Sequence, residues 1–445
     1  MGGRRFIDPF RCAGEGIETV KAIRAGLCFL FAFCVLAFGG VEVWALSVME
    51  IGAALLLVVW GVITYRQPDA KVEWNPLNWP LLGFVAIGLV QLLFRTTSYA
   101  YFTRTELLKL SAYAIIFFLA TQVFRKRPDL TKLAWFLILL GFGVSLFGII
   151  QHFTSGSKIY WYRELPLGGD LFGPYVNRNH FAGFVELVVP VGLGLMVFRG
   201  IRRDIFPLAT LLTIIPVSAL ILSGSRGGIV GFAFELGVLA LLVRSRQSRE
   251  GPHMAAVGMV ALAALALIAW IGAGKAIERF STLPTSDTSL ARRGTMVRAA
   301  TQIVRDHPIL GAGLGTLVVV YPRYETFYDG RVVEHVHNDY MEALAETGLV
   351  GGLCGLAFLT LLYRQARKNF EAEQGHFSRG LHAGAIVALS GLFLHSFVDF
   401  NLHLPSNALL FLLQVHLATS APLPSEAQVQ PRRRHRKHHA DEVPV

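Results

Sequence analysis

The chain has 445 residues, of which 53% are hydrophobic and only 16% are charged. A soluble globular protein carries roughly 25% charged residues. The aromatic content of 11% excludes disorder over most of the length, and four cysteines exclude a small disulfide-bonded scaffold. The composition therefore indicates a polytopic membrane protein. In such a protein, a net charge of +11 is better evidence for membrane topology than for nucleic-acid binding.

Twelve apolar stretches are long enough, or nearly long enough, to cross a bilayer. We therefore predict an all-α integral membrane protein with about 12 transmembrane helices. The first stretch is not a cleavable signal, because no small-residue cleavage site follows it and another apolar run begins at once. The predicted spans are 22–39, 46–64, 78–94, 106–124, 132–152, 180–198, 205–222, 227–243, 254–273, 345–363, 381–397 and 404–419.

The distribution of basic residues predicts the orientation of these spans. If the N-terminus is cytoplasmic, every short inner loop carries Lys or Arg, as the positive-inside rule requires. We therefore predict a cytoplasmic segment 1–21 and a polytopic membrane domain 22–420. Within that domain, 153–179 and 274–341 are large outer (periplasmic) loops, and the second of them has an interrupted amphipathic helical pattern.

A basic tail from 421 to 445 follows the last span. It is rich in Pro, Arg and His and has no apolar periodicity, so we predict a disordered cytoplasmic extension. The histidines at positions 435, 438 and 439 are possible metal ligands, but a solvated basic tail is the better explanation.

Polar side chains gather at four places on the predicted outer side. The first is the start of the sixth span, where Asn177, Arg178, Asn179 and His180 follow one another. They could form a helix cap with interfacial anchors, or they could bind a substrate. Both readings remain open, since four polar side chains exceed what one cap needs.

The second place is the turn between the seventh and eighth spans, Ser223-Gly-Ser-Arg-Gly-Gly228. Arg226 lies at the edge of the hydrocarbon, where a cation is costly unless it is paired or faces a wet cavity. It could snorkel to the interface, but the glycines favour an anion-binding turn, because they let a ligand approach the backbone.

The third place is a predicted amphipathic helix in the second outer loop, ending before Pro308. At about 100° per residue, Arg293 shares the face of the apolar residues, whereas Arg298 and Arg305 point the other way. We therefore expect Arg293 to face the protein or membrane, and Arg298 and Arg305 to face solvent.

The fourth place is Glu334-His-Val-His-Asn-Asp-Tyr340. In an extended segment, His335 and His337 lie on one side, and with Asp339 they could bind zinc. No further ligand cluster at a recognisable spacing supports a metal. A histidine near outer arginines is better explained as a base beside an anion site.

These motifs together resemble the O-antigen ligase and polymerase superfamily of bacterial membrane glycosyltransferases. The resemblance is densest over 173–352, and the predicted topology extends it to the whole chain. The late run 395–407 resembles a subgroup associated with exopolysaccharide synthesis. The motifs that carry the main resemblance are Asn177–Ala182, Ser225–Gly227, Asp306–Gly313, His337–Tyr340 and Ala345–Leu349.

The resemblance implies a C-type glycosyltransferase fold and an inverting, metal-independent reaction without a cofactor. The donor would be a glycan on undecaprenyl diphosphate, and the enzyme would work in the bilayer of the bacterial inner membrane without nucleic acid. Arg226 and Arg293 would bind the diphosphate, and His337 would orient or deprotonate the acceptor hydroxyl. The expected substrate-binding residues are Asn177, Asn179, His180, Asn338, Asp339 and Tyr340.

Four functions remain open at this point, and one of them is a protein O-glycosylating transferase, for which the sequence shows no added domain. A polymerase would join one lipid-linked repeat to another, and the 395–407 run favours it. A ligase would transfer the finished glycan to lipid A-core. A membrane transporter of twelve spans is the alternative of another class, although the sequence has no half-to-half repeat to support it.

Overall fold

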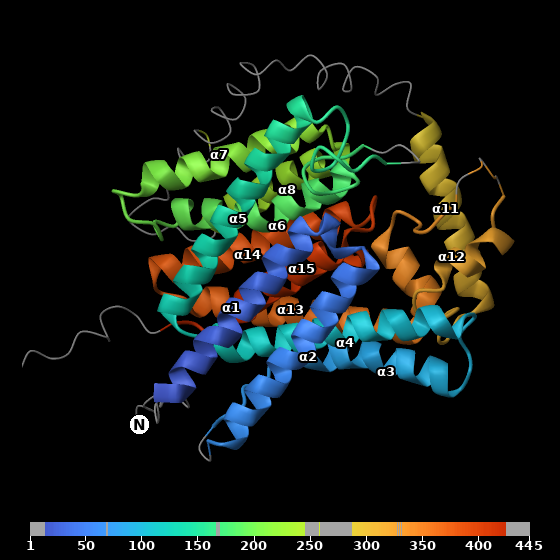
Figure 1. Cartoon of the computed structure of the whole chain (residues 1–445), viewed down its shortest axis with the longest axis horizontal. Helices are drawn as coiled ribbons and strands as arrows, with labels where there is room; N and C mark the ends of the chain where they lie inside the picture. Colours follow the sequence, from blue (N-terminus) through green and yellow to red (C-terminus); the bar gives the residue numbers. More distant parts are fainter. Residues whose placement is uncertain are drawn as a thin grey trace, which may run out of the picture.

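The computed structural model describes residues 14–67, 70–165, 170–244, 258, 287–326, 328, 330 and 332–423. The regular elements of these ranges are helices (Figure 1). In chain order they are α1 (Gly14–Leu36), η1 (Phe38–Gly40), α2 (Val43–Tyr65), α3 (Asn78–Leu93), α4 (Ala100–Val123), α5 (Arg127–Thr154), α6 (Arg178–Val197), α7 (Phe206–Ser223), α8 (Arg226–Arg244), α11 (Asp287–Asp306), α12 (Leu317–Val320), η3 (Tyr321–Arg323), α13 (Asp339–Ala372), α14 (His376–His395), η4 (Asn401–His403) and α15 (Pro405–Thr419).

Nine helices of the described residues are long and apolar enough to cross a membrane. They correspond to nine of the predicted spans, in agreement with an all-α, multi-pass membrane protein. The predicted spans 78–94 and 404–419 form the shorter helices α3 and α15. The predicted span 254–273 lies, apart from residue 258, outside the described residues, as does most of the predicted tail.

Helix α6 lies at the centre of the bundle, and every residue from His180 to Val197 is buried. It packs most extensively against α14, at a crossing made of small residues. A Cβ atom added to Gly194 would lie 2.3 Å from the backbone oxygen of Gly380, so no larger residue fits there. The two helices run antiparallel, and the start of α6 therefore lies beside the end of α14.

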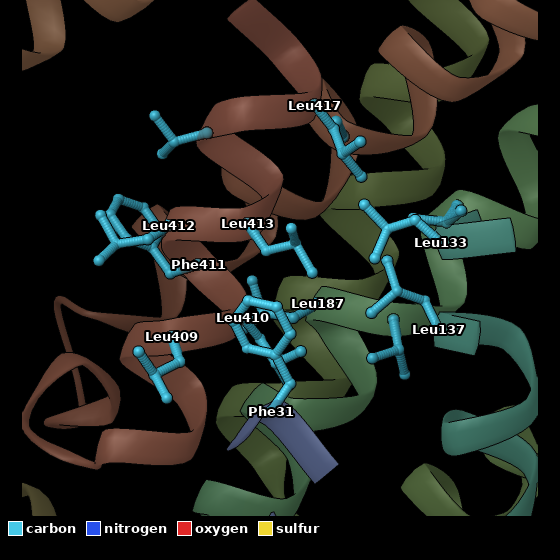
Figure 2. Packing of buried hydrophobic residues seen from close by; sticks show 14 of the residues in the cluster. Phe31, Leu133, Leu137, Leu187, Leu409, Leu410, Phe411, Leu412, Leu413 and Leu417 are labelled. Carbon is cyan, nitrogen blue, oxygen red and sulfur yellow. The ribbon is translucent and has the colours of Figure 1, made fainter. Parts of the chain in front are cut away.

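Helix α15 has only 15 residues, and all of them are buried. Figure 2 shows how its leucines meet side chains of α1, α5 and α6, namely Phe31, Leu133, Leu137 and Leu187. Because protein surrounds this helix, the thickness of the bilayer does not set its length. Its enclosure holds the preceding segment 396–404 close to the start of α6.

A second apolar cluster lies where α11 and α12 come together at one end of the bundle (Figure 1). Met296 and Ala300 of α11 are buried in this cluster, whereas Arg298 and Arg305 are exposed. The predicted division of α11 into an apolar and a solvated face is thus confirmed. The cluster also contains Ala345, so α11 and α12 are packed onto the first turns of α13.

Two of the sequence motifs bind each other through their backbones. The N–H of Ala312 donates to the carbonyl oxygen of Ala345 at 2.8 Å, and the N–H of Leu349 donates to the carbonyl oxygen of Pro308 at 2.8 Å. Gly348 has a φ of +63° and interrupts α13, and a Cβ atom added to it would lie 2.5 Å from the carbonyl carbon of Ile309. The glycine therefore lets the backbone of the Asp306–Gly313 motif cross close to α13, which fixes the position of the first turns of α13.

Candidate active site

Asp399 is the shared partner of three polar side chains that the sequence places far apart. It is 0% exposed. Its Oδ2 accepts a hydrogen bond from Nδ2 of Asn179 at 2.6 Å, and its Oδ1 lies 3.2 Å from Nδ1 of His337 and 3.7 Å from Nε2 of His180. Burial alone would raise the pKa of Asp399, but the interactions with His180 and His337 outweigh it and hold the pKa well below its ordinary value. Asp399 is therefore a carboxylate at neutral pH.

His337 occupies the residue position just before the helix cap of α13, with a φ of +52°. The following residue, Asn338, is the N-cap, and its side-chain oxygen accepts the N–H of Met341 at 2.9 Å. The His337 side chain is 26% exposed. When Nδ1–H donates to Asp399, Nε2 keeps its lone pair and can accept a proton. A left-handed backbone conformation costs free energy at a non-glycine residue. Residues in such conformations are often found at functional sites.

The start of α6 combines a structural role with a link between motifs. Asn177 is the N-cap of α6, since its side chain accepts the N–H of Asn179 at 2.9 Å. Asn179 reaches in two directions: Nδ2 donates to Asp399, and Oδ1 accepts the hydroxyl of Ser225 at 2.8 Å. Asn179 therefore connects the His337–Asp399 pair to the turn that begins α8.

The ring of Phe400 lies in contact with three histidines. His335 stacks on it with a centroid distance of 4.2 Å, while His180 and His337 meet it edge-on at 4.6 Å and 4.9 Å. The backbone N–H of Phe400 donates to Oδ1 of Asp399 at 3.0 Å. The loop after α14 thus supplies both the carboxylate and the aromatic wall that orient these histidines.

The residues after His337 bind the same loop. Asn338 donates to the carbonyl of Phe397 at 3.0 Å, and the hydroxyl of Tyr340 donates to that of Phe393 at 2.7 Å. Asp339 accepts the hydroxyl of Ser396 at 2.7 Å and lies 2.9 Å from Nδ1 of His403. These polar groups hold the His337 loop against the end of α14, while their predicted role in binding substrate stays a prediction.

His335 belongs to a separate network from His337. Its Nδ1 lies 2.6 Å from Oε1 of Glu342, which is also 3.2 Å from Nε2 of His403. The zinc ligands considered from the sequence, His335, His337 and Asp339, are therefore divided between two networks. Within the described residues, the side chains that could hold a metal ion are His335, Glu342 and His403, whose donor atoms lie within 4.8 Å of one another.

His403 carries a positive charge in this second network. Burial would lower its pKa, but the carboxylates of Glu342 and Asp339 outweigh burial and raise the pKa of His403 to about 10. A metal ion bound at His403 would have to displace that proton. Without a metal ion, both ring nitrogens of His403 already have carboxylate partners, Asp339 at Nδ1 and Glu342 at Nε2.

Arg226 is the first residue of α8 and is half-buried. The preceding residue, Ser225, caps the helix, because its hydroxyl oxygen accepts the N–H of Gly228 at 3.2 Å. The cap and its bond to Asn179 fix the turn in which Arg226 lies. The positive end of the α8 dipole is thus linked through Ser225 and Asn179 to Asp399.

Arg293 is half-buried on α11, as its place on the apolar face predicted. Its charge acts on His395, the last residue of α14. His395 in turn packs against Gly227, since a Cβ atom added there would lie 2.6 Å from its Nε2. The outer helix α11 therefore brings Arg293 toward the turn that contains Arg226.

Sequence reasoning gave no role to three residues of this site: Asp399, His395 and Glu186. Nδ1 of His395 lies 2.9 Å from Oε2 of Glu186, and both side chains are buried. The signal for Glu186 was available, because a carboxylate inside a predicted span is costly and so indicates a function. His395 and Asp399 lie in the 395–407 run, whose resemblance to a subgroup implies no role for either residue.

Residues 211–356 match the model of the family described as O-antigen ligase. This segment contains Arg226, Arg293 and His337, and it ends before His395 and Asp399. No curated protein matches the chain.

Proposed function

We propose that this multi-pass protein, whose residues 211–356 match the family described as O-antigen ligase, transfers a glycan from undecaprenyl diphosphate to an acceptor hydroxyl. The reaction would take place on the outer face of the bacterial inner membrane, with both termini of the protein in the cytoplasm. The observation that carries the proposal is the His337–Asp399 pair, whose Nδ1 to Oδ1 distance is 3.2 Å, next to the turn of Arg226.

His337 is the proposed general base. The Asp399 carboxylate fixes the tautomer with a proton on Nδ1, and Nε2 then accepts the proton of the acceptor hydroxyl. The acceptor oxygen forms a bond to the anomeric carbon from the face opposite the diphosphate. The bond from that carbon to the phosphate oxygen breaks, and its electron pair leaves with undecaprenyl diphosphate. Attack from the opposite face inverts the anomeric centre.

Arg226 and Arg293 are the proposed ligands of the diphosphate. A diphosphate leaving group gains negative charge as the bond breaks, and guanidinium groups match phosphate oxygens with paired N–H donors. Such preorganised donors stabilise the charge of the transition state, especially at the edge of a membrane where the dielectric constant is low. Two guanidiniums and the N-terminal end of α8 supply the positive charge that a divalent cation would otherwise provide.

The acceptor distinguishes the two enzymatic candidates. A polymerase uses a second lipid-linked repeat, whereas a ligase uses lipid A-core, and the donor site is the same for both. We favour the polymerase because the segment 395–407, which supplies Asp399, carries the resemblance to exopolysaccharide enzymes. The match of residues 211–356 to the family described as O-antigen ligase keeps the ligase as the second candidate.

The test is an in vitro transfer assay with the purified full chain in lipid nanodiscs. Lipid-linked repeat would be supplied alone, and in parallel with lipid A-core, and the products separated by mass. Elongated lipid-linked glycan from the repeat alone supports the polymerase, and glycan on lipid A-core supports the ligase. Movement of the lipid-linked repeat across a proteoliposome membrane without any new glycosidic bond would contradict both and support a transporter.

A further inference from the structure

A second carboxylate–histidine pair lies inside the bundle, close to the Arg226 turn. His395 ends α14, and its Nδ1 lies 2.9 Å from Oε2 of Glu186 on α6. The His395 side chain is 1% exposed and that of Glu186 is 0% exposed. Burying an ionisable side chain inside a membrane bundle costs free energy unless the group is paired or binds a ligand. The contact with Glu186 gives a partner to only one of the two imidazole nitrogens of His395.

The other nitrogen of His395 has no hydrogen-bond partner among the described residues. Nε2 is buried and faces Gly227, in the first turn of α8. A Cβ atom at Gly227 would lie 2.6 Å from Nε2, so the glycine leaves room for the imidazole at this turn. An unpaired buried nitrogen costs free energy comparable to a lost hydrogen bond, and a bound ligand would recover it.

The surroundings of this nitrogen select an anion. Arg226 precedes Gly227 in the same turn, and Arg293 acts on His395 together with the carboxylates of Glu186 and Asp399. The N-terminus of α8 adds the positive end of a helix dipole. With Glu186 accepting a hydrogen bond from Nδ1–H, an imidazolium can donate its Nε2–H to a phosphate oxygen, as a charge-assisted hydrogen bond.

We propose that His395, held by Glu186, is a third ligand of the diphosphate, beside Arg226 and Arg293. This inference rests on the proposed function, because it assumes a polyprenyl diphosphate as the donor. His395 contacts the leaving group, whereas His337 serves the acceptor. The site would thus contain two carboxylate–histidine pairs with different tasks, one at each end of the bond that breaks.

The test measures binding of undecaprenyl diphosphate to the full chain in nanodiscs, with undecaprenol as the uncharged counterpart. His395→Gln should weaken diphosphate binding about tenfold to a hundredfold, as expected for a lost charge-assisted hydrogen bond, and leave undecaprenol binding unchanged. Gly227→Ala should act in the same direction, because its methyl group takes the place next to Nε2. Thermal unfolding of each variant checks that the bundle is intact.

Matched control variants come from the same two helices. His382 lies on α14 as well, is buried, and pairs with Glu373 with an Nδ1 to Oε2 distance of 3.4 Å, but it is at the opposite end of the helix. Gly237 lies on α8, and a Cβ atom added to it meets nothing within 4 Å. His382→Gln and Gly237→Ala should both bind undecaprenyl diphosphate like the wild type.

The outcomes separate this inference from the function on which it rests. If the wild type binds undecaprenol and undecaprenyl diphosphate equally, the proposed function is wrong and the inference falls with it. If the wild type prefers the diphosphate and His395→Gln keeps that preference in full, only the inference is overturned. Should His395→Gln fail to fold, Gly227→Ala decides in the same way.

Discussion

The carboxylate of Asp399 lies 3.2 Å from Nδ1 of His337, although 62 positions separate the two residues. His337 lies just before α13 and Asp399 just after α14, and the antiparallel packing of α6 and α14 brings both to the start of α6. The contact gives His337 a defined tautomer and an open Nε2. Most of the chemistry proposed for the acceptor side depends on this one relationship.

Replacing Asp399 with Asn tests that dependence. The amide keeps the size of the side chain but removes the acceptor that fixes the proton on Nδ1, so we expect transfer to fall about a hundred- to ten-thousandfold. Binding of the lipid-linked donor should persist. Asp306→Asn is the control, because this exposed carboxylate accepts the hydroxyl of Tyr324 on the surface and the substitution should change transfer little. Equal loss of transfer in both variants would contradict the role of Asp399.

The pH dependence of stability tests the charge on His403. Its pKa is raised to about 10, above the ordinary value of roughly 6.5, so the folded protein binds the proton more tightly than the unfolded chain. This contribution to the free energy of unfolding is fully present below about pH 6.5 and is lost as the pH rises through about 10. The unfolding temperature should therefore fall from neutral pH toward pH 10.

His403→Gln should flatten that decline, and the exposed His376 supplies the control, since His376→Gln should leave the pH profile unchanged. The measurement is a thermal unfolding series of the three proteins in the same detergent. A wild-type profile as flat as that of His403→Gln would mean that His403 is not charged in the folded state.

Chelation tests the proposal of metal independence. Because Arg226 and Arg293 supply the charge for the diphosphate, transfer should be fully retained after dialysis against EDTA. If activity is instead lost and zinc restores it, the ligands to test are His335, Glu342 and His403, whose donor atoms lie within 4.8 Å of one another. His337 is in the other network and would not be among them.

The predicted topology can be tested by labelling single cysteines in a cysteine-free background. An impermeant reagent added to spheroplasts should label cysteines at the partly exposed Lys158 and the exposed Ile309, both in segments assigned to the outer side. It should not label cysteines at Lys126 and Arg367, which are exposed in segments assigned to the cytoplasm. Labelling of the second pair in intact spheroplasts would overturn the orientation.

The sequence predicted those features that depend on local periodicity. The spacing of apolar residues placed nine of the helices that the described residues contain, and it separated buried Met296 and half-buried Arg293 from exposed Arg298 on α11. The position of Asn177 before an apolar run likewise indicated the cap of α6. Neighbours three or four residues apart determine these features, so one sequence suffices to predict them.

Pairings over long separations could not be derived in the same way. Asn179 and Asp399 are 220 positions apart, and Glu186 and His395 are 209 apart, so no local pattern relates them. They meet because Gly194, Gly380 and Gly384 let α6 and α14 pack closely, which fixes the register of the two helices. Polar residues in spans indicated that partners must exist, but only the packing identifies them.

In the proposed mechanism, Arg293 binds the donor diphosphate and His337 accepts the proton of the acceptor hydroxyl. The most direct measurement determines donor binding and transfer separately for Arg293→Ala, Arg298→Ala and His337→Ala, after equal membrane insertion has been verified. We expect Arg293→Ala to lose roughly a hundred- to thousandfold in transfer and to bind the donor more weakly. His337→Ala should bind the donor normally and transfer nothing, and Arg298→Ala, on the exposed face, should resemble the wild type. Near-normal transfer by His337→Ala, or equal damage from the two arginine variants, would contradict the account.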